Sequence, residues 1–175
     1  MINVELKIDK PYPEIKVENE NTYYAQLLQE DYAGPSSEIT AIMQYIYQGF
    51  DKFQMNPEFS HIISKIAIVE MKHLELLGKT IKALGGKPEF KFVNKKEKYL
   101  EFWNGSFVDF RTRFKDMLIR DIELEKDAIK SYYKHIKLID DKYIRILLKR
   151  IIEDELVHLE CFNKMLYMIS ESDVI

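Results

Sequence analysis

The stretch IIEDELVHLECF, residues 151–162, places two polar side chains on a helix face that is otherwise apolar. At the three- and four-residue spacing of that face stand Ile151, Glu155, His158, Leu159 and Phe162. Burial removes the water that stabilises a carboxylate or an imidazolium, so a core-facing glutamate and histidine need a partner that offsets the cost. The rest of the sequence indicates what that partner is.

The composition limits the classes of protein to which the chain can belong. With 175 residues, 46% of them hydrophobic, it is long enough for one globular domain with a core of its own. Its 26 Lys and Arg residues nearly balance its 29 Asp and Glu residues, so we expect no nucleic-acid partner. A single cysteine, Cys161, excludes an internal disulfide and a CxxC metal or redox motif.

The sequence offers no candidate for a membrane span or a secretion signal. No apolar run approaches the roughly 20 residues that cross a bilayer. The first ten residues, MINVELKIDK, lack the apolar segment of a signal peptide. We therefore expect a cytoplasmic protein with no membrane partner.

The chain is expected to begin with an extended arm. Residues 2–8, INVELKI, alternate apolar and polar side chains, and Pro11 and Pro13 forbid a helix just after them. Asn21 can cap a short helix that ends before Gly34 and Pro35. We assign residues 1–35 to this arm and short helix, and residues 36–170 to the main domain.

Four longer amphipathic helices are expected in the main domain. Their predicted starts are Ser36 or Ser37, Asn56–Pro57, Ser106 and Asp140–Asp141, and Gly85–Gly86 ends the second. The links after the first and third helices are short, whereas the lysine- and aromatic-rich residues 87–105 can run the length of a bundle. This organisation predicts an all-α, antiparallel four-helix bundle with one long crossover.

Each of the four helices carries one glutamate within its apolar stripe. These are Glu38, Glu70, Glu125 and Glu155, and the second helix of each hairpin adds a histidine three residues later, His73 and His158. A tyrosine, Tyr45 or Tyr132, follows the lone glutamate of each hairpin by seven residues. The two halves therefore look like two copies of one hairpin.

Electrostatics indicates that these residues hold metal ions. Burying a carboxylate costs several kcal/mol, four that face one another also repel, and the stripes contain no Lys or Arg to neutralise them. Two divalent cations would cancel four carboxylates, and two neutral imidazoles would complete the coordination. A donor set rich in carboxylate and free of thiolate suits iron or manganese better than structural zinc. We therefore predict two Fe or Mn ions per chain, and the alternative is a polar core without metal.

A single ExxH spacing is weak evidence, because glutamate is common in this chain. Glu58 and His61 have the same spacing, but Glu58 lies in the first turn of the second helix and about 120° away from the face of Glu70. We expect that pair at the surface. Only the two spacings that lie within apolar stripes, each matched by a glutamate on another helix, indicate a metal site.

Four further residues are candidates for supporting roles. A ligating histidine usually donates its other N–H to a carboxylate, which Asp121 and Asp154 are placed to provide. The alternative for both is an exposed helix aspartate. Tyr45 and Tyr132 can hydrogen-bond to the ligand carboxylates, or they can be ordinary core aromatics.

These motifs resemble those of the ferritin-like di-iron and di-manganese carboxylate proteins, over roughly residues 27–168. The stretches similar to bacterioferritin are EITAIMQY (38–45), VEMKH (69–73), DIELEKDAIKSYY (121–133) and EDELVH (153–158), while LLQEDYAGPSSE (27–38) is more similar to manganese catalases and their spore-coat relatives. The resemblance implies a ferritin-like fold, the same six ligands, and Glu70 and Glu155 as bridges between the ions.

Some positions depart from parts of this superfamily. Rubrerythrins carry an extra glutamate three residues from the third-helix ligand, where this chain has Ile122 and Ala128, and they usually add a cysteine-rich iron domain. Met71 coincides with the haem-ligating methionine of bacterioferritin, so haem is a further cofactor that the resemblance implies. The alternative for Met71 is a contact at a dimer face.

Three functions remain open at this point. The first is a dimetal oxidoreductase that decomposes or reduces hydrogen peroxide, as manganese catalases and rubrerythrins do. The second is a ferroxidase or iron-handling protein like bacterioferritin, with dioxygen or peroxide as the small oxidant. The third is a structural assembly protein, such as a spore-coat component, which would make the location spore-associated. We also expect a homodimer or larger homo-oligomer, with the aromatic crossover packed on a neighbouring subunit or back on its own bundle.

Overall fold

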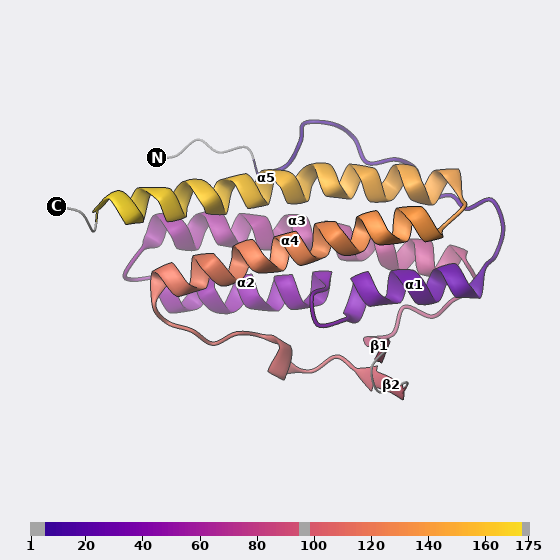
Figure 1. Cartoon of the computed structure of the whole chain (residues 1–175), viewed down its shortest axis with the longest axis horizontal. Helices are drawn as coiled ribbons and strands as arrows, with labels where there is room; N and C mark the ends of the chain where they lie inside the picture. Colours follow the sequence, from indigo (N-terminus) through magenta and orange to yellow (C-terminus); the bar gives the residue numbers. More distant parts are fainter. Residues whose placement is uncertain (1–5, 95–98, 173–175) are drawn as a thin grey trace.

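Long helices lie side by side along one axis in the computed structural model, which describes residues 6–94 and 99–172 (Figure 1). In chain order the elements are α1 Thr22–Ala33, α2 Glu38–Lys52, α3 Pro57–Ala83, β1 Lys91–Asn94, β2 Tyr99–Phe102, a 3₁₀ turn at Gly105–Phe107, α4 Phe114–Leu138 and α5 Lys142–Ser172. Short links make α2–α3 and α4–α5 antiparallel hairpins, and the long α3–α4 link crosses the bundle. The predicted four-helix bundle with one crossover is confirmed.

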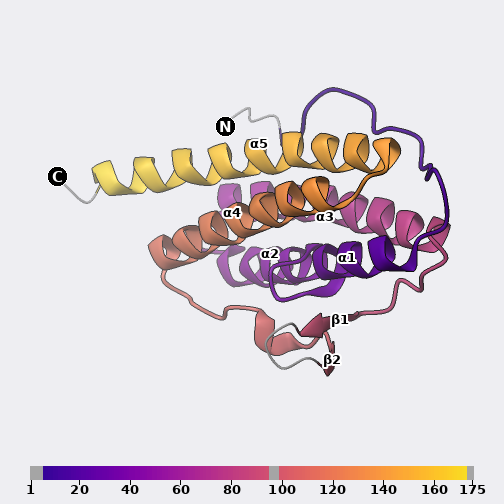
Figure 2. The ribbon, with the colours of Figure 1, turned by 45° about the vertical axis from the view of Figure 1, so that its right-hand side comes forward.

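One of the four positions in the bundle is shared by two helices in line, α1 and α2 (Figure 2). Gly34 is extended, with ψ −178°, and Pro35 has no N–H with which to continue a helix. A Cβ at Gly34 would lie 2.5 Å from the carbonyl oxygen of Glu30, so the close approach of the chain requires glycine here. Because the helix starts again at Glu38, that carboxylate lies at the positive end of the α2 dipole.

Side chains cap the starts of α1, α3 and α5, as the sequence predicts. Each accepts a hydrogen bond from the backbone N–H three residues later: Asn21 from Tyr24 at 3.0 Å, Asn56 from Phe59 at 3.1 Å and Asp141 from Ile144 at 3.1 Å. α2 follows Ser37, one of its two predicted starts. α3 ends before Gly85, whose φ of 82° favours glycine.

The predicted start of the third long helix at Ser106 is wrong, because α4 begins at Phe114. After the 3₁₀ turn the chain runs extended across α2. There the side-chain amide of Gln44 accepts from the Asp109 N–H at 2.7 Å and donates to the Asp109 carbonyl at 2.8 Å. Backbone groups satisfied in this way need no helical partners. Phe110, which a helix starting at Ser106 would include, therefore lies outside α4.

The aromatic-rich link contains an antiparallel strand pair that the sequence analysis did not predict. β1 and β2 pair with Lys91 opposite Phe102. The strands pack back on their own bundle, because the Trp103 indole N–H donates to the Thr40 hydroxyl at 2.9 Å. Phe92 is buried as well.

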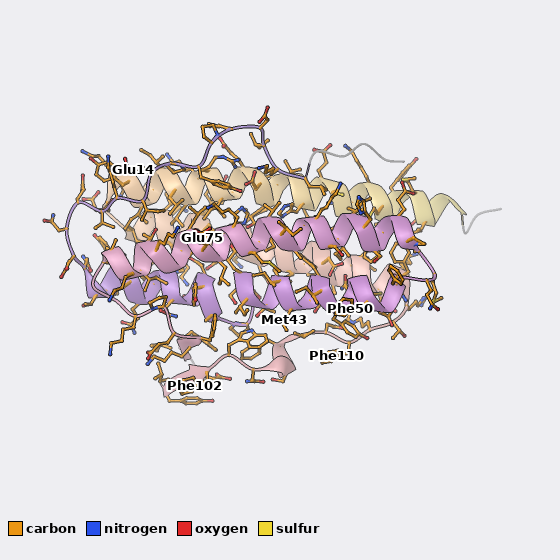
Figure 3. All side chains as sticks on the ribbon, turned by 180° about the vertical axis from the view of Figure 1, so that it is seen from behind. Glu14, Met43, Phe50, Glu75, Phe102 and Phe110 are labelled. Carbon is orange, nitrogen blue, oxygen red and sulfur yellow. The ribbon has the colours of Figure 1, made fainter. Side chains whose placement is uncertain are left out.

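Other large apolar side chains remain at the surface. Figure 3 labels four that are exposed in the structure, Met43, Phe50, Phe102 and Phe110. The expected oligomer stays a prediction, since a single chain does not show what covers them. None of the helices in the described ranges is long and apolar enough to cross a membrane.

The core consists of two apolar clusters, one toward each end of the bundle. The first joins α1 to the later part of α3, the end of α4 and the early part of α5, with Leu77 and Leu148 fully buried. The second joins α2 to the early parts of α3 and α4 and the later part of α5, with Ile63 and Phe162 fully buried. The polar residues singled out from the sequence lie between these two clusters.

The arm that precedes α1 contains no helix or strand from residue 6 to residue 20, and it runs along α5 (Figure 1). Residues 1–5, which include part of the alternating stretch, lie outside the described residues. Leu6 packs against the second apolar cluster, whereas Tyr12, Ile15 and Val17 pack against the first. The described arm therefore spans the boundary between the two clusters.

A buried polar pair that the sequence analysis missed joins α1 to α4. His135 Nδ1 lies 2.6 Å from Asp31 Oδ2, and the Ser131 hydroxyl donates to Asp31 Oδ1 at 2.6 Å. Burial alone would lower the pKa of His135, but the hydrogen bonds with Asp31 and Glu30 raise it to about 9. The imidazole is therefore protonated at neutral pH, and the pair ties α1 to the bundle.

We predict that His135→Gln destabilises the fold by about 3 kcal/mol at pH 7, as expected when one partner of a buried ion pair is removed. The folded-state pKa lies above the ordinary value of 6.5, so the charge contributes fully below about pH 6.5 and is lost as the pH rises through about 9. Chemical unfolding at pH 7 and at pH 10 should show the deficit shrinking at the higher pH. His61→Gln, at an exposed histidine, is the control. A deficit that does not change with pH would contradict the prediction.

Candidate metal centre

Six side chains converge at the middle of the bundle, between the two apolar clusters. They come from the start of α2 (Glu38), the middle of α3 (Glu70 and His73), α4 (Glu125) and α5 (Glu155 and His158). Each is at most 4% exposed. The sequence analysis predicted that these six residues face inward, and the structure places all of them together.

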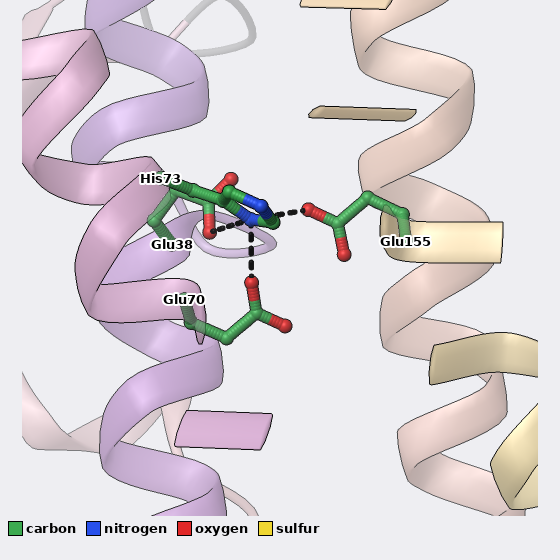
Figure 4. Close-up of side chains that lie close together, drawn as sticks. All are labelled: Glu38, Glu70, His73 and Glu155. Atoms are coloured by element: carbon green, nitrogen blue, oxygen red, sulfur yellow. Dashed lines mark hydrogen bonds and ion pairs between the residues drawn. The ribbon is translucent and has the colours of Figure 1, made fainter. Parts of the chain in front are cut away.

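The first half of the cluster surrounds the imidazole of His73 (Figure 4). Its Nδ1 lies 2.9 Å from Glu70 Oε2, 3.1 Å from Glu155 Oε1 and 3.7 Å from Glu38 Oε2. Donor atoms of these four residues all lie within 4.8 Å of one another, close enough to share one ion.

The second half surrounds the imidazole of His158. Its Nδ1 lies 3.0 Å from Glu70 Oε1, 3.3 Å from Glu155 Oε2 and 3.9 Å from Glu125 Oε2. Glu70 and Glu155, the shared glutamates, thus turn one oxygen to each imidazole. Glu38 and Glu125, the outer glutamates, each approach one imidazole only. This geometry suits a site for two ions with the shared glutamates between them.

The charges of the cluster are compensated internally. Burial, and after it the charges of Glu155 and Glu70, raises the pKa values of both outer glutamates well above the usual range. Burial alone would also raise the pKa of Glu155, but the two imidazoles hold it well below its usual range. Burial would lower the pKa values of the imidazoles, yet the carboxylates raise them well above the usual range. The carboxylates and imidazoles therefore stabilise each other's charges within the cluster.

The cluster fits two divalent cations on three observations. No Lys or Arg in the described ranges pairs with any of the four glutamates. Glu70 Oε1 is buried without a hydrogen-bond partner, although it lies near an imidazole nitrogen. A cavity of about 10 Å³, room for about one water molecule, is lined by all four carboxylates together with Ala41, Leu124, Ala128 and Tyr132. The donors are carboxylate oxygens and imidazole nitrogens, which suit manganese or iron.

The tyrosines support the outer glutamates, as one of the two sequence-based interpretations proposed. The Tyr45 hydroxyl donates to Glu125 Oε1, and the Tyr132 hydroxyl donates to Glu38 Oε1. Both tyrosines are buried. Each tyrosine therefore donates a hydrogen bond to the outer glutamate of the other hairpin.

The two aspartates behave differently from each other. Asp154 Oδ2 lies 3.2 Å from His73 Nε2, as expected for a residue that orients a ligating histidine. Asp121 contacts neither imidazole of the cluster, which corrects the expectation for this residue. It lies on the face of α4 that meets α2, where its Oδ1 accepts from the Gln48 amide at 2.7 Å.

Sequence reasoning missed the residues that reach the outer nitrogens of the imidazoles. His158 Nε2 lies 2.9 Å from the carbonyl oxygen of Leu6, and the Tyr12 hydroxyl donates to Asp154 at 2.6 Å. Both contacts come from the arm, whose alternating residues do not indicate which distant groups its backbone and side chains meet. Arg150 pairs with Asp154 at 2.7 Å, and its four-residue spacing was a usable signal.

The remaining sequence candidates lie away from the cluster. Glu58 and His61 are exposed, as predicted. Met71 is 44% exposed on α3, and its possible role as a haem ligand stays a prediction. Cys161 is buried with a raised thiol pKa, caused mainly by burial, as expected for a small core residue.

Comparison with known proteins identifies the family. The sequence model of the family described as manganese-containing catalase matches residues 10–102, more than half of the chain. The chain belongs to the manganese-containing catalase family. The matched residues include the arm from residue 10 onward and, within α2 and α3, Glu38, Glu70 and His73.

Individual members of this family and of the wider superfamily agree with that assignment. A probable manganese catalase of Clostridium acetobutylicum is 27% identical over 87% of this chain and 74% of its own length. The crystal structure of KatB, a manganese catalase from Anabaena, matches 93% of this chain and 80% of its own with a TM-score of 0.82 and 25% identity. The diiron bacterioferritin of Desulfovibrio desulfuricans matches 85% of this chain and 81% of its own, with a TM-score of 0.72 and 25% identity. These likenesses confirm the ferritin-like fold.

We predict that substitutions change the metal content in steps. Glu70→Ala and Glu155→Ala should each lower the content from about two ions per chain to near zero, because a shared glutamate faces both halves. Glu38→Ala should leave about one ion, since it faces only the His73 half. Elemental analysis of protein produced with both iron and manganese available measures this. The matched control is Glu58→Ala, at the exposed ExxH of the same helix. Equal losses in all four variants would contradict the assignment.

Proposed function

We propose that this protein is a dinuclear manganese catalase that converts hydrogen peroxide to water and dioxygen. The proposed ligands are Glu38, Glu70, His73, Glu125, Glu155 and His158, with the shared glutamates as bridges. The observation that carries the proposal is the buried cluster of four carboxylates and two imidazoles in a chain of the manganese catalase family. Peroxide would be the substrate and two manganese ions the cofactor.

The chemistry requires a pair of redox ions and a protected space beside them. Two adjacent manganese ions would supply or accept two electrons together, which is the number needed to reduce peroxide to water or to oxidise it to dioxygen. The protein holds the ligands from four separate helices and fixes the outer glutamates through Tyr45 and Tyr132. Ala41, Leu124 and Ala128 give the cavity an apolar wall, which limits the water that can enter.

The cavity also suggests where peroxide would enter. Ser36 and Ser37, in the break between α1 and α2, line it together with the carboxylates. Ser36 also lines a larger surface depression formed with Glu30, Lys130 and Lys134. The break in the helix is therefore the route by which we propose that peroxide reaches the cluster.

Iron oxidation is a second candidate, because the likeness to the diiron bacterioferritin extends over 85% of this chain. The same carboxylate and imidazole donors suit iron as well as manganese. The family assignment favours manganese and peroxide. A purely structural role would require full metal occupancy without either activity.

The decisive test is the reaction of metal-loaded protein with hydrogen peroxide. We predict that the manganese form releases one dioxygen for every two peroxide molecules without an added electron donor, measured with an oxygen electrode. Glu70→Ala should abolish this release by removing the ions, while Glu58→Ala should retain it. Fast ferrous oxidation by the iron form, with no oxygen release by the manganese form, would instead support the second candidate.

A further inference from the structure

We propose that residues 6–12 of the N-terminal arm help the metal centre to bind its ions. In this proposal Tyr12 and the Leu6 carbonyl position the two histidines for metal binding. This inference rests on the dinuclear site of the proposed function. It assigns a role to a segment that lies outside all five helices and contributes none of the six proposed ligands.

The arm fixes the proton of His158. A carbonyl oxygen can only accept a hydrogen bond, so the 2.9 Å contact with Leu6 requires that Nε2 of His158 carries the proton. In a neutral imidazole the lone pair then lies on Nδ1, the nitrogen that faces the shared glutamates. The backbone of the arm thus selects the tautomer that can bind an ion.

The arm acts on His73 through Asp154. The carboxylate of Asp154 faces His73 Nε2 at 3.2 Å, and two groups of the arm hold it there. The Tyr12 hydroxyl donates to Oδ2 at 2.6 Å, and the Ile8 N–H donates to Oδ1 at 2.8 Å. The ring of Tyr12 also packs edge-on against the imidazole, with centroids 6.0 Å apart. Asp154 therefore depends on the arm for its position.

Arg150 connects the docking of the arm to the same carboxylate. Its side chain, 4% exposed, donates to the carbonyls of Ile8 and Lys10 at 2.9 and 2.8 Å, and it pairs with Asp154 at 2.7 Å. Its guanidinium lies 4.5 Å from the centroid of the Tyr12 ring. The contacts that dock the arm and those that orient His73 therefore share two residues, Arg150 and Asp154.

Because Arg150 and Asp154 take part in both sets of contacts, we expect metal binding and docking of the arm to favour each other. If the docked arm favours the ion-binding orientation of the imidazoles, bound ions must favour the docked arm by the same factor. Tyr12 and the Leu6 carbonyl are positioning groups, because they act through Asp154 and the histidines and not on the substrate.

The experiment compares manganese binding to the full chain and to Tyr12→Phe, by competition with a chelator and without any assay of activity. Tyr12→Phe removes one hydroxyl and keeps the ring over Arg150, and we expect manganese affinity to fall about tenfold, as for other groups that orient metal ligands. Ile8→Pro removes the N–H that holds Asp154 and should act in the same direction. Tyr23→Phe changes an exposed tyrosine of α1, outside the arm, and should leave the affinity unchanged.

Amide hydrogen exchange in the presence and absence of manganese tests whether the arm responds to the ions. If the arm only stabilised the fold, its exchange rates would not depend on manganese. We expect the amides of residues 6–12 to exchange more slowly when manganese is bound, and we expect Tyr12→Phe to reduce that difference. Unfolding of each metal-free variant with urea checks that the fold is retained. Manganese affinity within twofold of the unsubstituted chain in Tyr12→Phe, or arm exchange that manganese does not affect, would overturn the inference.

The outcome separates this inference from the proposed function. If the unsubstituted chain binds manganese and releases oxygen but Tyr12→Phe binds equally well, the inference fails and the function stands. If Tyr12→Phe weakens binding in a protein that releases no oxygen, the inference holds and the catalase assignment fails.

Discussion

The burial of four carboxylates at the centre of an apolar bundle is the constraint on which the rest of the structure depends. Each carboxylate comes from a different helical segment, and apolar clusters on both sides exclude water from them. Four buried carboxylates repel one another unless positive charge lies among them. Among the residues that the structure describes, the imidazoles of His73 and His158 are the basic groups next to these carboxylates, and bound cations would supply the same charge. The hydrogen bonds from Tyr45, Tyr132 and the arm keep the donors in place, because a loosely held charge in this position would be costly.

The broken helix is a second requirement of the same centre. A continuous helix in place of α1 and α2 would satisfy its own backbone groups and would close the wall of the bundle. The break at Gly34 and Pro35 instead places Glu38 at a helix start and brings Ser36 and Ser37 to the cavity. Asp31 and His135 then keep α1 attached to α4 beside the break. The break between α1 and α2 and the contact that holds α1 in place therefore lie next to each other in the structure.

The sequence predicted the features that repeat along helices and missed those that do not. The stripes, the caps at Asn21, Asn56 and Asp141, and the inward glutamates follow from periodicity and local chemistry, and the structure has all of them. The late start of α4 was not predictable, because a side chain distant in sequence, Gln44, satisfies the extended backbone there. The arm contacts of Leu6 and Tyr12 are long-range for the same reason. Asp121 was misassigned because helix spacing alone does not tell which neighbour a buried side chain meets.

The hydrogen bonds of Tyr45 and Tyr132 make the two halves of the chain depend on each other. Tyr45 lies in the first hairpin and serves Glu125 in the second, while Tyr132 lies in the second and serves Glu38 in the first. Neither hairpin supplies the hydrogen bond that its own outer glutamate receives, and each supplies the one that the other hairpin's glutamate receives. Two identical half-length peptides that associate about a twofold axis would make the same two hydrogen bonds by symmetry.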